Sequence, residues 1–283
     1  MNVSVESLKQ ELLAHGPWAA LTGAGVSAAS GIPTYRDHDG RWLGSAPIQH
    51  QEFIEDEEKR RRYWSRSVLG WPRVGRAIPN QTHSALTRLQ QINLLHGVIT
   101  QNVDRLHQAA GTENVIDLHG RLDQVRCLDC DASFARASIQ DWLEAYNRLP
   151  DIQSVTLRPD GDADLPGAFV DGFAVPTCTV CGGTLMPDVV FFGGTVPSNI
   201  TQACLDLIDA ANGLMVIGTS LSVFSGLRFC RYAAAEKKRL IILNQGPTRA
   251  DGLCHAKFEA DAFSLLAMCT DELVGRSTEQ TYA

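Results

Sequence analysis

Short apolar runs alternate along the chain with segments of helical periodicity, and each run leads into a polar or glycine-rich break. This alternation is typical of an α/β chain whose strands form a parallel sheet. We therefore predict a Rossmann-like parallel sheet whose strands are residues 18–21, 97–99, 115–118, 214–217 and 240–243.

The clearest predicted helix covers residues 199–211. Its apolar residues recur at steps of three and four, which places Cys204 on the packed face. Ser198 or Asn199 is available as the N-cap. Cys230 follows an apolar residue by three positions in the same way, so we interpret both cysteines as core side chains rather than reactive thiols.

Two segments do not follow the alternation of strands and helices. Residues 37–81 are rich in charged and aromatic side chains and predict a helical insertion. Further along, a predicted helix at 137–148 precedes a loop rich in proline, glycine and aspartate at 151–172. We expect a discontinuous Rossmann-like domain formed by residues 1–40, 82–125 and 185–283. We expect a smaller domain formed by residues 41–81 and 126–184.

The composition limits the partners of this chain. It has 283 residues and carries 25 Lys and Arg against 32 Asp and Glu, without the basic excess of a nucleic-acid-binding protein. Its apolar runs are far shorter than the roughly 20 residues that span a bilayer, and its N-terminus lacks the pattern of a secretory signal or a transit peptide. We therefore expect a cytoplasmic monomer that binds neither nucleic acid nor membranes.

The candidate chemistry lies where the predicted strands end. In open parallel sheets, ligands bind beyond the carboxyl ends of the strands. Each predicted strand leads into hydroxyl, amide, carboxylate or imidazole side chains, and parallel strands bring these groups to one edge. We predict a binding site at this edge, formed by residues 22–33, 100–107, 119–120, 218–222 and 244–248.

A glycine-rich loop follows the first predicted strand. The segment from Gly23 through Gly25 to Ala28 matches G-x-G-x-x-G/A, in which glycines let the backbone approach a pyrophosphate at a helix N-terminus. A tight turn without a ligand would show the same pattern. The acidic residue that holds a ribose about 20 positions later in dehydrogenases is absent, so the loop favours a phosphate site but not hydride transfer.

Four of the eight cysteines form two C-x-x-C pairs, and this pattern is a strong zinc signal. Cys127 and Cys130 form the first pair, and Cys178 and Cys181 form the second. Four thiolates complete a tetrahedral zinc site and leave no open position, so we predict a structural metal. A redox C-x-x-C is the alternative, and the presence of two pairs disfavours it.

His119 differs from the other histidines by its position. It ends a predicted strand, precedes Gly120, and lies close in sequence to Cys127, at the expected junction of the two domains. An imidazole at such a place can accept a proton near neutral pH. Most histidines are core or surface side chains, but this position makes His119 a candidate for proton transfer.

These motifs together are similar to those of the sirtuins, the NAD-dependent protein-lysine deacylases. The resemblance rests on GAGVSAASGIPTYR at 23–36, TQNVD at 100–104, LHG at 118–120, the cysteine pairs, GTSL at 218–221 and Asn244, and covers most of the chain in the family's order. Residues 47–50, 62–66, 70–72 and 187–193 most resemble class II, which includes the mitochondrial lipoamidase-type sirtuin and its bacterial relatives.

The resemblance implies a role for each matching residue. His119 would be the general base, with Asn102 and Asp104 also catalytic. One structural zinc ion would bind the four cysteines, and NAD would be a consumed co-substrate. Residues on the NAD side would be Gly23, Ala24, Gly25, Val26, Ser27, Tyr35, Arg36, Gln101, Asn102, Val103, Asp104, Gly218, Thr219, Ser220, Asn244, Gln245, Gly246 and Ala262; those on the acyl side would be Tyr63, Arg66, Val190, Phe191, Phe192 and Gly193.

The resemblance also implies a reaction. The acyl oxygen of an acyl-lysine protein would displace nicotinamide from the ribose, and a ribose hydroxyl activated by the base would then capture the acyl group. The products would be lysine, nicotinamide and O-acyl-ADP-ribose. Mono-ADP-ribosyl transfer to a protein, or a non-catalytic NAD-sensing zinc module, would use the same residues.

Two features depart from the family's pattern or leave a choice open. The family's common Gly-Ile-Pro-Asp ends here in Thr34, a mild change at a loop position. Tyr63 and Arg66 have the Tyr-x-x-Arg spacing with which desuccinylase-type sirtuins read acidic acyl groups. A basic run on a solvated helix face is the equally weighted alternative for this arginine.

Overall fold

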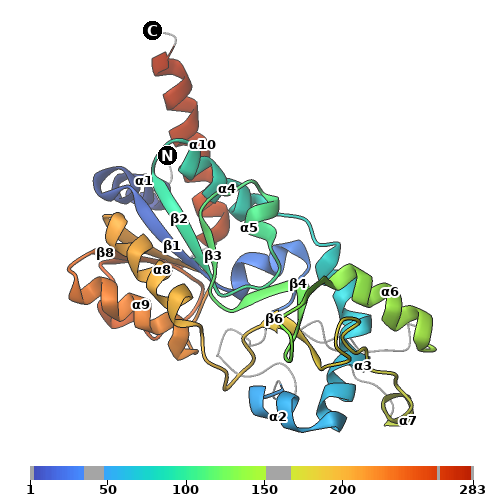
Figure 1. Cartoon of the computed structure of the whole chain (residues 1–283). Helices are drawn as coiled ribbons and strands as arrows, with labels where there is room; N and C mark the ends of the chain where they lie inside the picture. The colour runs from blue at the N-terminus through green and yellow to red at the C-terminus, as the bar shows by residue number, and fades with distance from the viewer. Residues whose placement is uncertain (1–2, 35–47, 151–166, 260–261, 282–283) are drawn as a thin grey trace.

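The computed structural model describes residues 3–34, 48–150, 167–259 and 262–281, and it contains two sheets (Figure 1). The larger sheet has the strand order β3-β2-β1-β7-β8-β9, and every neighbouring pair is parallel. All five predicted strands are present in it, so the predicted Rossmann-like sheet is confirmed. Its strands are β1 Trp18–Thr22, β2 Leu95–Thr100, β3 Val115–Asp117, β7 Gly213–Ile217, β8 Arg239–Leu243 and β9 Ala256–Phe258.

Helices cover both faces of this sheet, which explains why its central strands are apolar throughout rather than alternating. Side chains of β1 alternate between two cores: Trp18 and Ala20 pack on one side, and Ala19 and Leu21 on the other. The first core includes residues of α1 (Val3–His15), α4 (Gln81–Gln91) and α10 (Ala262–Thr281). The second includes residues of α8 (Ser198–Ala210) and α9 (Phe224–Ala235).

Strand β1 is the switch point of the sheet, because β2 pairs with one of its edges and β7 with the other. The connections from these strands therefore diverge at their carboxyl ends and leave a crevice there, where ligands bind in open α/β sheets. No helix in the described part of the chain has the length and apolar content needed to cross a membrane.

Helix α8 confirms the predicted amphipathic segment, with one error at its start. Cys204 on α8 and Cys230 on α9 are fully buried, and burial raises the pKa of both thiols to about 12. They are therefore core residues, as expected. The N-cap is Pro197 and no side chain caps it, so the prediction of Ser198 or Asn199 as cap was wrong. The fixed φ of proline already places the chain at the entry to the helix.

A smaller antiparallel sheet forms the other half of the molecule, together with several helices (Figure 1). Its order is β5-β4-β6, and the sequence patterns missed it because β4 is mostly half-buried and β5 has only three residues. Its strands are β4 Gly120–Cys127, β5 Ser133–Ala135 and β6 Leu185–Val189, and the helices of this half are α2 His50–Glu55, α3 Glu57–Gly75, α6 Arg136–Tyr146 and α7 Gly167–Asp171.

The helices of this half confirm most of the expected helical content. Helices α2 and α3 lie in the predicted insertion, whose residues 37–47 are outside the described part. Helix α6 matches the helix expected at 137–148 within two residues. The expected loop at 151–172 is wrong at its end, where α7 covers five residues. Residues 151–166 lie outside the described part.

Arg136 fixes α6 to α3 from a buried position. Its side chain is only 1% exposed, and Nη2 donates to the carbonyl and the hydroxyl of Ser67, at 3.3 and 3.2 Å. The guanidinium carbon lies 5.6 Å from the ring of Trp64 and 5.2 Å from that of Trp71, within the range of cation–π attraction. Burial lowers the pKa of Arg136 to about 10, so it stays charged at neutral pH and holds the face of α3 that carries these residues.

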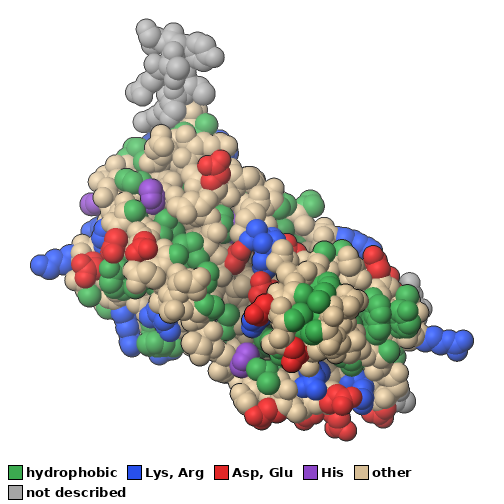
Figure 2. All heavy atoms as spheres, in the orientation of Figure 1, with side chains coloured by type: hydrophobic (Ala, Val, Ile, Leu, Met, Phe, Trp, Pro, Cys, Tyr) green, Lys and Arg blue, Asp and Glu red, His purple; other side chains and the backbone are tan. Residues whose placement is uncertain are grey.

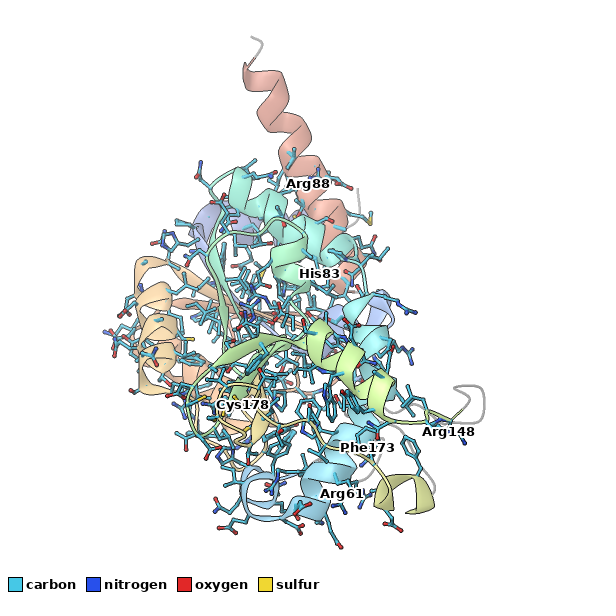
Figure 3. The ribbon with its side chains drawn as sticks, turned by 45° about the vertical axis from the view of Figure 1, so that its right-hand side comes forward. Arg61, His83, Arg88, Arg148, Phe173 and Cys178 are labelled. Atoms are coloured by element: carbon cyan, nitrogen blue, oxygen red, sulfur yellow. The ribbon has the colours of Figure 1, made fainter. Side chains whose placement is uncertain are left out.

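Two buried histidines lie behind the carboxyl edge of the large sheet. His83 is on α4 (Figure 3) and His107 on α5 (Leu106–Ala109), and their ring centroids are 4.8 Å apart. Nε2 of His107 is 2.9 Å from the hydroxyl of Thr22 at the end of β1. Burial lowers the pKa of His83 to about 4, although the charge of Asp104 opposes the shift. Burial and the neighbouring His83 lower the pKa of His107 to about 3.

This histidine pair should make the fold sensitive to acid. Both pKa values lie below the value of about 6.5 in unfolded chains. Between pH 6.5 and pH 4, the unfolded state therefore binds protons that the folded state does not bind. We expect the free energy of unfolding to fall by roughly 2 kcal/mol per histidine between pH 6.5 and 4.5. Urea titrations across this range measure the loss.

A variant tests whether the pair is responsible for this slope. The double substitution His83→Gln and His107→Gln should flatten the slope, because glutamine does not titrate. Imidazole NMR signals of the wild-type protein should stay those of neutral rings down to pH 4.5. Titration of either ring near pH 6.5 would contradict the expectation.

Candidate active site

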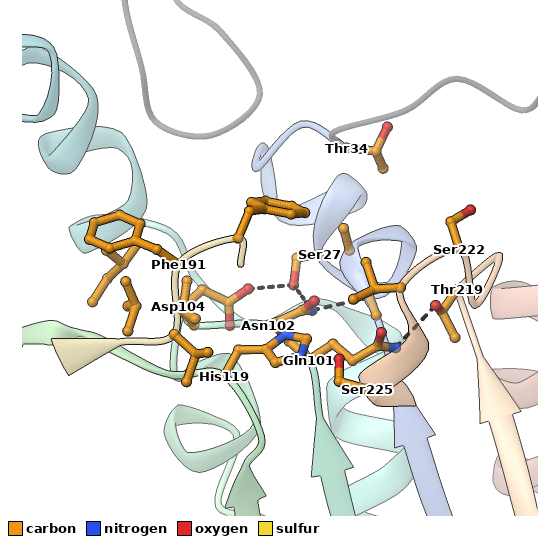
Figure 4. A pocket seen from close by; sticks show the side chains of 18 of the residues that line it. Ser27, Thr34, Gln101, Asn102, Asp104, His119, Phe191, Thr219, Ser222 and Ser225 are labelled. Atoms are coloured by element: carbon orange, nitrogen blue, oxygen red, sulfur yellow. Dashed lines mark hydrogen bonds between the residues drawn. The ribbon is translucent and has the colours of Figure 1, made fainter. Parts of the chain in front are cut away.

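A cavity of about 1270 Å³ lies at the carboxyl edge of the parallel sheet, between the two halves of the molecule (Figure 4). Residues that follow five strands line it, as the strand-end argument predicts. From the predicted NAD side, its walls include Gly23, Ala24, Gly25, Ser27, Gln101, Asn102, Val103, Asp104, Gly218, Thr219, Ser220, Asn244 and Gln245, and His119 also faces it.

The glycine loop continues into a 3-10 helix, η1 (Ala24–Ser30), that packs directly against the loop after β7. The amide of Gly25 donates to the carbonyl of Gly218 at 3.0 Å. A Cβ on Gly23 would lie 2.6 Å from Cβ of Thr219, and one on Gly25 would lie 2.9 Å from the Gly218 carbonyl. Side chains at these positions would push the two loops apart, so the glycines are needed for the cavity wall itself as well as for an approaching phosphate.

Asn102, Ser27 and Asp104 form one hydrogen-bonded unit below the glycine loop (Figure 4). Nδ2 of Asn102 donates to the Gly23 carbonyl and to Oγ of Ser27, both at 3.0 Å. Oγ of Ser27 donates to Oδ2 of Asp104 at 2.6 Å, and Oδ1 accepts the amide of Leu106 at 2.9 Å. The end of β2 is thereby fixed to the loop after β1, and an amide and a carboxylate are held at the cavity wall.

His119 lies between β3 and β4 with each ring nitrogen in contact with a partner. Nδ1 is 3.0 Å from the carbonyl of Gln101, which can only accept, so Nδ1 carries the proton and Nε2 the lone pair. Nε2 is 2.7 Å from Oγ of Ser225. Burial lowers the pKa of His119, and the bond to Gln101 opposes the shift only in part. The imidazole is therefore neutral at pH 7 and able to accept a proton.

The loops after β7 and β8 form the far wall of the cavity. Oγ1 of Thr219 accepts from Nε2 of Gln101 at 3.0 Å, and the hydroxyls of Ser220 and Ser222 are 2.8 Å apart. The side chain of Asn244 is nearly buried and donates to the carbonyl of Gln245 at 2.7 Å. These contacts link the predicted adenosine side to Gln101 and so to the base.

Five residues predicted on the NAD side do not line the cavity or cannot be placed. Val26 is 1% exposed and packs into the first core, and Gly246 is not among the lining residues. Ala262 is the first residue of α10 and its side chain is outside the described part, whereas its neighbour Phe263 lines the cavity. Tyr35 and Arg36 lie outside the described residues.

The four cysteines of the C-x-x-C pairs come together at one end of the small sheet; Figure 3 labels Cys178. Their sulfur atoms all lie within 4.8 Å of one another; those of Cys127 and Cys181 are 3.5 Å apart, and those of Cys130 and Cys178 are 3.7 Å apart. Four thiolates at about 2.3 Å from a tetrahedral zinc ion lie about 3.8 Å from each other. The cluster therefore fits one structural zinc ion, as predicted.

The residues predicted on the acyl side all line the same cavity: Tyr63, Arg66, Val190, Phe191, Phe192 and Gly193. The ring of Tyr63 packs edge-on against Phe53 and Phe191, with centroids 5.4 and 5.3 Å apart. The amide of Val190 donates to the carbonyl of His119 at 2.8 Å. Tyr63 and Phe191, which form the aromatic wall of the cavity, are therefore linked to the base through one backbone hydrogen bond.

The charged run at the start of α3 has two faces. Arg61 forms an ion pair with Glu57 at 2.9 Å, and acidic and basic side chains lie next to each other over α2 and α3 at the lower edge of Figure 2. Arg66 is half-buried and lines the cavity. The charged run therefore has a solvated position at the exposed Arg62, whereas Arg61 and Arg66 are both half-buried.

The model of the Sir2 family matches residues 23–225. The chain belongs to the Sir2 family. It is 45% identical over 262 residues to the NAD-dependent protein deacetylase 2 of Bradyrhizobium diazoefficiens, covering 93% of this chain and 96% of that protein. It is 44% identical over 274 residues to the NAD-dependent protein deacetylase 3 of Pseudomonas syringae pv. tomato, covering 96% and 97%.

Solved structures agree with this family. The chain superposes with a TM-score of 0.76 and 25% identity on a Sir2 structure that holds a deacetylated p53 peptide and 3′-O-acetyl-ADP-ribose, covering 95% of this chain and 98% of that one. The resemblance to sirtuins and the expected fold are therefore confirmed. Membership of class II stays a prediction.

This Sir2 chain also lines its cavity with residues that the sequence patterns did not single out. Leu122 is on the missed strand β4, two residues after Gly120, and alternation along that strand does not mark it, because the buried Val125 and Cys127 are out of phase with it. Others come from α3, from the loop before α8 and from α9, and no motif marks them: among them are Lys59, Ser67, Thr195, Val196, Ser225 and Arg228.

Proposed function

We propose that this Sir2 protein is an NAD-dependent protein-lysine deacylase that releases nicotinamide, free lysine and O-acyl-ADP-ribose. The observation that carries the proposal is the neutral His119 imidazole, held by Gln101 in the same cavity that the glycine loop and an aromatic wall line. Two bacterial relatives named as NAD-dependent protein deacetylases support it over nearly the whole chain.

The cavity has the parts that such a reaction needs. Its volume of about 1270 Å³ exceeds the range of about 300 to 1,000 Å³ of ordinary ligand pockets, which leaves room for a dinucleotide and an acyl-lysine side chain together. NAD, when bound, supplies the ribose carbon that the acyl oxygen attacks and the nicotinamide that leaves. The glycine loop would bind the phosphates, because backbone amides at a helix N-terminus favour negative charge.

The residues of the chain then have distinct tasks. Asn102 and Asp104 would orient the ribose and nicotinamide, since their side chains are fixed to the glycine loop at the cavity wall. His119 would accept the proton of a ribose hydroxyl, which makes that oxygen a nucleophile toward the acyl carbon. Tyr63, Phe191 and Arg66 would contact the acyl chain. The cysteines would hold zinc away from the reacting groups.

We further propose that residues 1–40, 82–125 and 185–283 act as the NAD-binding domain and residues 41–81 and 126–184 as the small domain. The larger sheet supports this division, because all of its strands lie in the first set. The small sheet is shared between the sets, with β5 in the second and β6 and most of β4 in the first. The enzyme would act as a monomer on acyl-lysine proteins, since residues of a single chain line both the NAD side and the acyl side of the cavity.

The direct test is incubation with NAD and a panel of acyl-lysine peptides, from acetyl to longer and acidic chains. We expect release of nicotinamide and formation of O-acyl-ADP-ribose in equal amounts, measured by mass spectrometry, with the preferred acyl group showing the highest kcat/KM. Nicotinamide release without deacylated peptide, accompanied by ADP-ribose on a protein, would favour ADP-ribosyl transfer. No nicotinamide from any peptide would overturn the proposal.

A further inference from the structure

The hydroxyl of Ser225 is the nearest side-chain partner of the proposed base, and no motif of the sequence points to it. Its Oγ is 2.7 Å from Nε2 of His119, although the two residues are 106 positions apart in the chain. Ser225 is the second residue of α9 and lines the cavity (Figure 4). The contact therefore lies inside the site, on the nitrogen that the reaction uses.

The direction of this hydrogen bond follows from the other side of the ring. Because the Gln101 carbonyl takes the proton of Nδ1, Nε2 is an acceptor and the Ser225 hydroxyl donates to it. Once Nε2 has taken a proton, the same oxygen can accept from it, since a hydroxyl is both donor and acceptor. Ser225 can thus keep contact with the imidazole in both protonation states.

The packing of α9 fixes both partners of the ring together. A Cβ on Gly226 would lie 2.8 Å from Oε1 of Gln101, so the first turn of α9 rests directly on the Gln101 side chain. Nε2 of that side chain donates to the Thr22 carbonyl at 3.2 Å and to Thr219 at 3.0 Å. The carbonyl and the hydroxyl that hold His119 therefore belong to one packed unit.

We propose that Ser225 is a positioning residue for the general base, an inference that rests on the proposed deacylase function. The bond from Nδ1 to Gln101 alone leaves the imidazole free to tilt about that contact. The second contact at Nε2 restricts the ring plane and keeps the lone pair directed into the cavity. When a ribose hydroxyl arrives, the Ser225 hydroxyl rotates away from the lone pair and leaves the ring in place.

Such a role affects only the second half of the reaction. Displacement of nicotinamide by the acyl oxygen needs no base, whereas activation of the ribose hydroxyl needs the lone pair of His119. Loss of alignment by a fraction of an ångström at a reacting group lowers the rate of that step without lowering affinity. The expected signature is a separation between nicotinamide exchange and deacylation.

The test compares Ser225→Ala with Ser225→Thr, which retains a hydroxyl at the same carbon. For Ser225→Ala we expect kcat of deacylation to fall about tenfold, with unchanged KM for NAD and for peptide and an unchanged rate of exchange of labelled nicotinamide. Ser225→Thr should recover most of the lost kcat. Ser138→Ala, at an exposed serine in the first turn of α6, is the matched control.

Each other outcome decides against the inference. An unchanged kcat in Ser225→Ala would mean that Gln101 alone holds the base. A parallel fall of exchange and deacylation, not recovered by threonine, would mean that the serine only supports the fold. A wild-type protein that shows neither exchange nor deacylation would overturn the proposed function itself. The wild-type assay therefore separates this outcome from the two outcomes that concern Ser225.

Discussion

Replacing His119 by alanine should lower deacylation by about 10² to 10⁴-fold, the usual contribution of a general base, while NAD binding and nicotinamide exchange remain. The physical reason is the division of contacts in the cavity. The glycine loop and the unit of Ser27, Asn102 and Asp104 are hydrogen-bonded among themselves and do not use the imidazole. Removal of the ring therefore deletes the proton acceptor without loosening the predicted NAD side.

The pH dependence gives a second measure of the same residue. Burial lowers the pKa of His119 below its ordinary value, which is about 6.5, so the imidazole stays neutral at pH 6.5 and is protonated only at lower pH. The acidic limb of kcat/KM for the wild-type enzyme should therefore lie below pH 6.5. An acidic limb above that value would contradict the assignment, because it would belong to a group whose pKa is raised.

The matched control for this variant is His96→Ala. His96 is exposed on β2, at the opposite end of the strand from Gln101. We expect its loss to leave kcat unchanged. Steady-state assays measure the loss of deacylation, and calorimetric titrations with NAD measure whether binding remains. Turnover of His119→Ala at the wild-type rate would refute the role of this residue as base.

The large sheet was predictable because its strands are buried on both faces. Leu214 and Ile242, for example, lie in continuous apolar runs that no exposed strand would carry, and each run leads directly into residues that line the cavity. The cysteine cluster was predictable for another reason. The spacing within each C-x-x-C pair is local, and zinc chemistry demands that two such pairs meet.

The rest of the site depends on contacts between distant segments. The bond between His119 and Ser225 forms only because α9 packs onto Gln101, and that approach requires the absence of a side chain at Gly226. Leu122 reaches the cavity from β4, a strand whose residues are half-buried and show no strong periodicity. His119 and Ser225 are 106 positions apart in the chain, so no local sequence pattern contains both residues or could indicate their contact.

Removing one zinc ligand should unfold the small sheet. In Cys178→Ala we expect zinc to fall from about one equivalent per chain to well below one, with loss of protease resistance across residues 120–135 and 178–189. Binding of structural zinc contributes about 10 to 16 kcal/mol in small zinc modules, whereas whole domains are stable by about 5 to 15 kcal/mol. A sheet of three short strands cannot replace a contribution of that size.

The loss should extend to the active site. Strand β4 leaves the cluster at Cys127 and runs back to Gly120, next to His119, while the segment after β6 donates the amide of Val190 to the His119 carbonyl. Deacylation should therefore fall with the metal content. Cys254→Ala is the matched control, because this half-buried thiol lies outside the cluster and its Sγ donates only to the Asp251 carbonyl at 3.2 Å. A Cys178→Ala protein that stays folded with a full equivalent of zinc would refute the four-thiolate site.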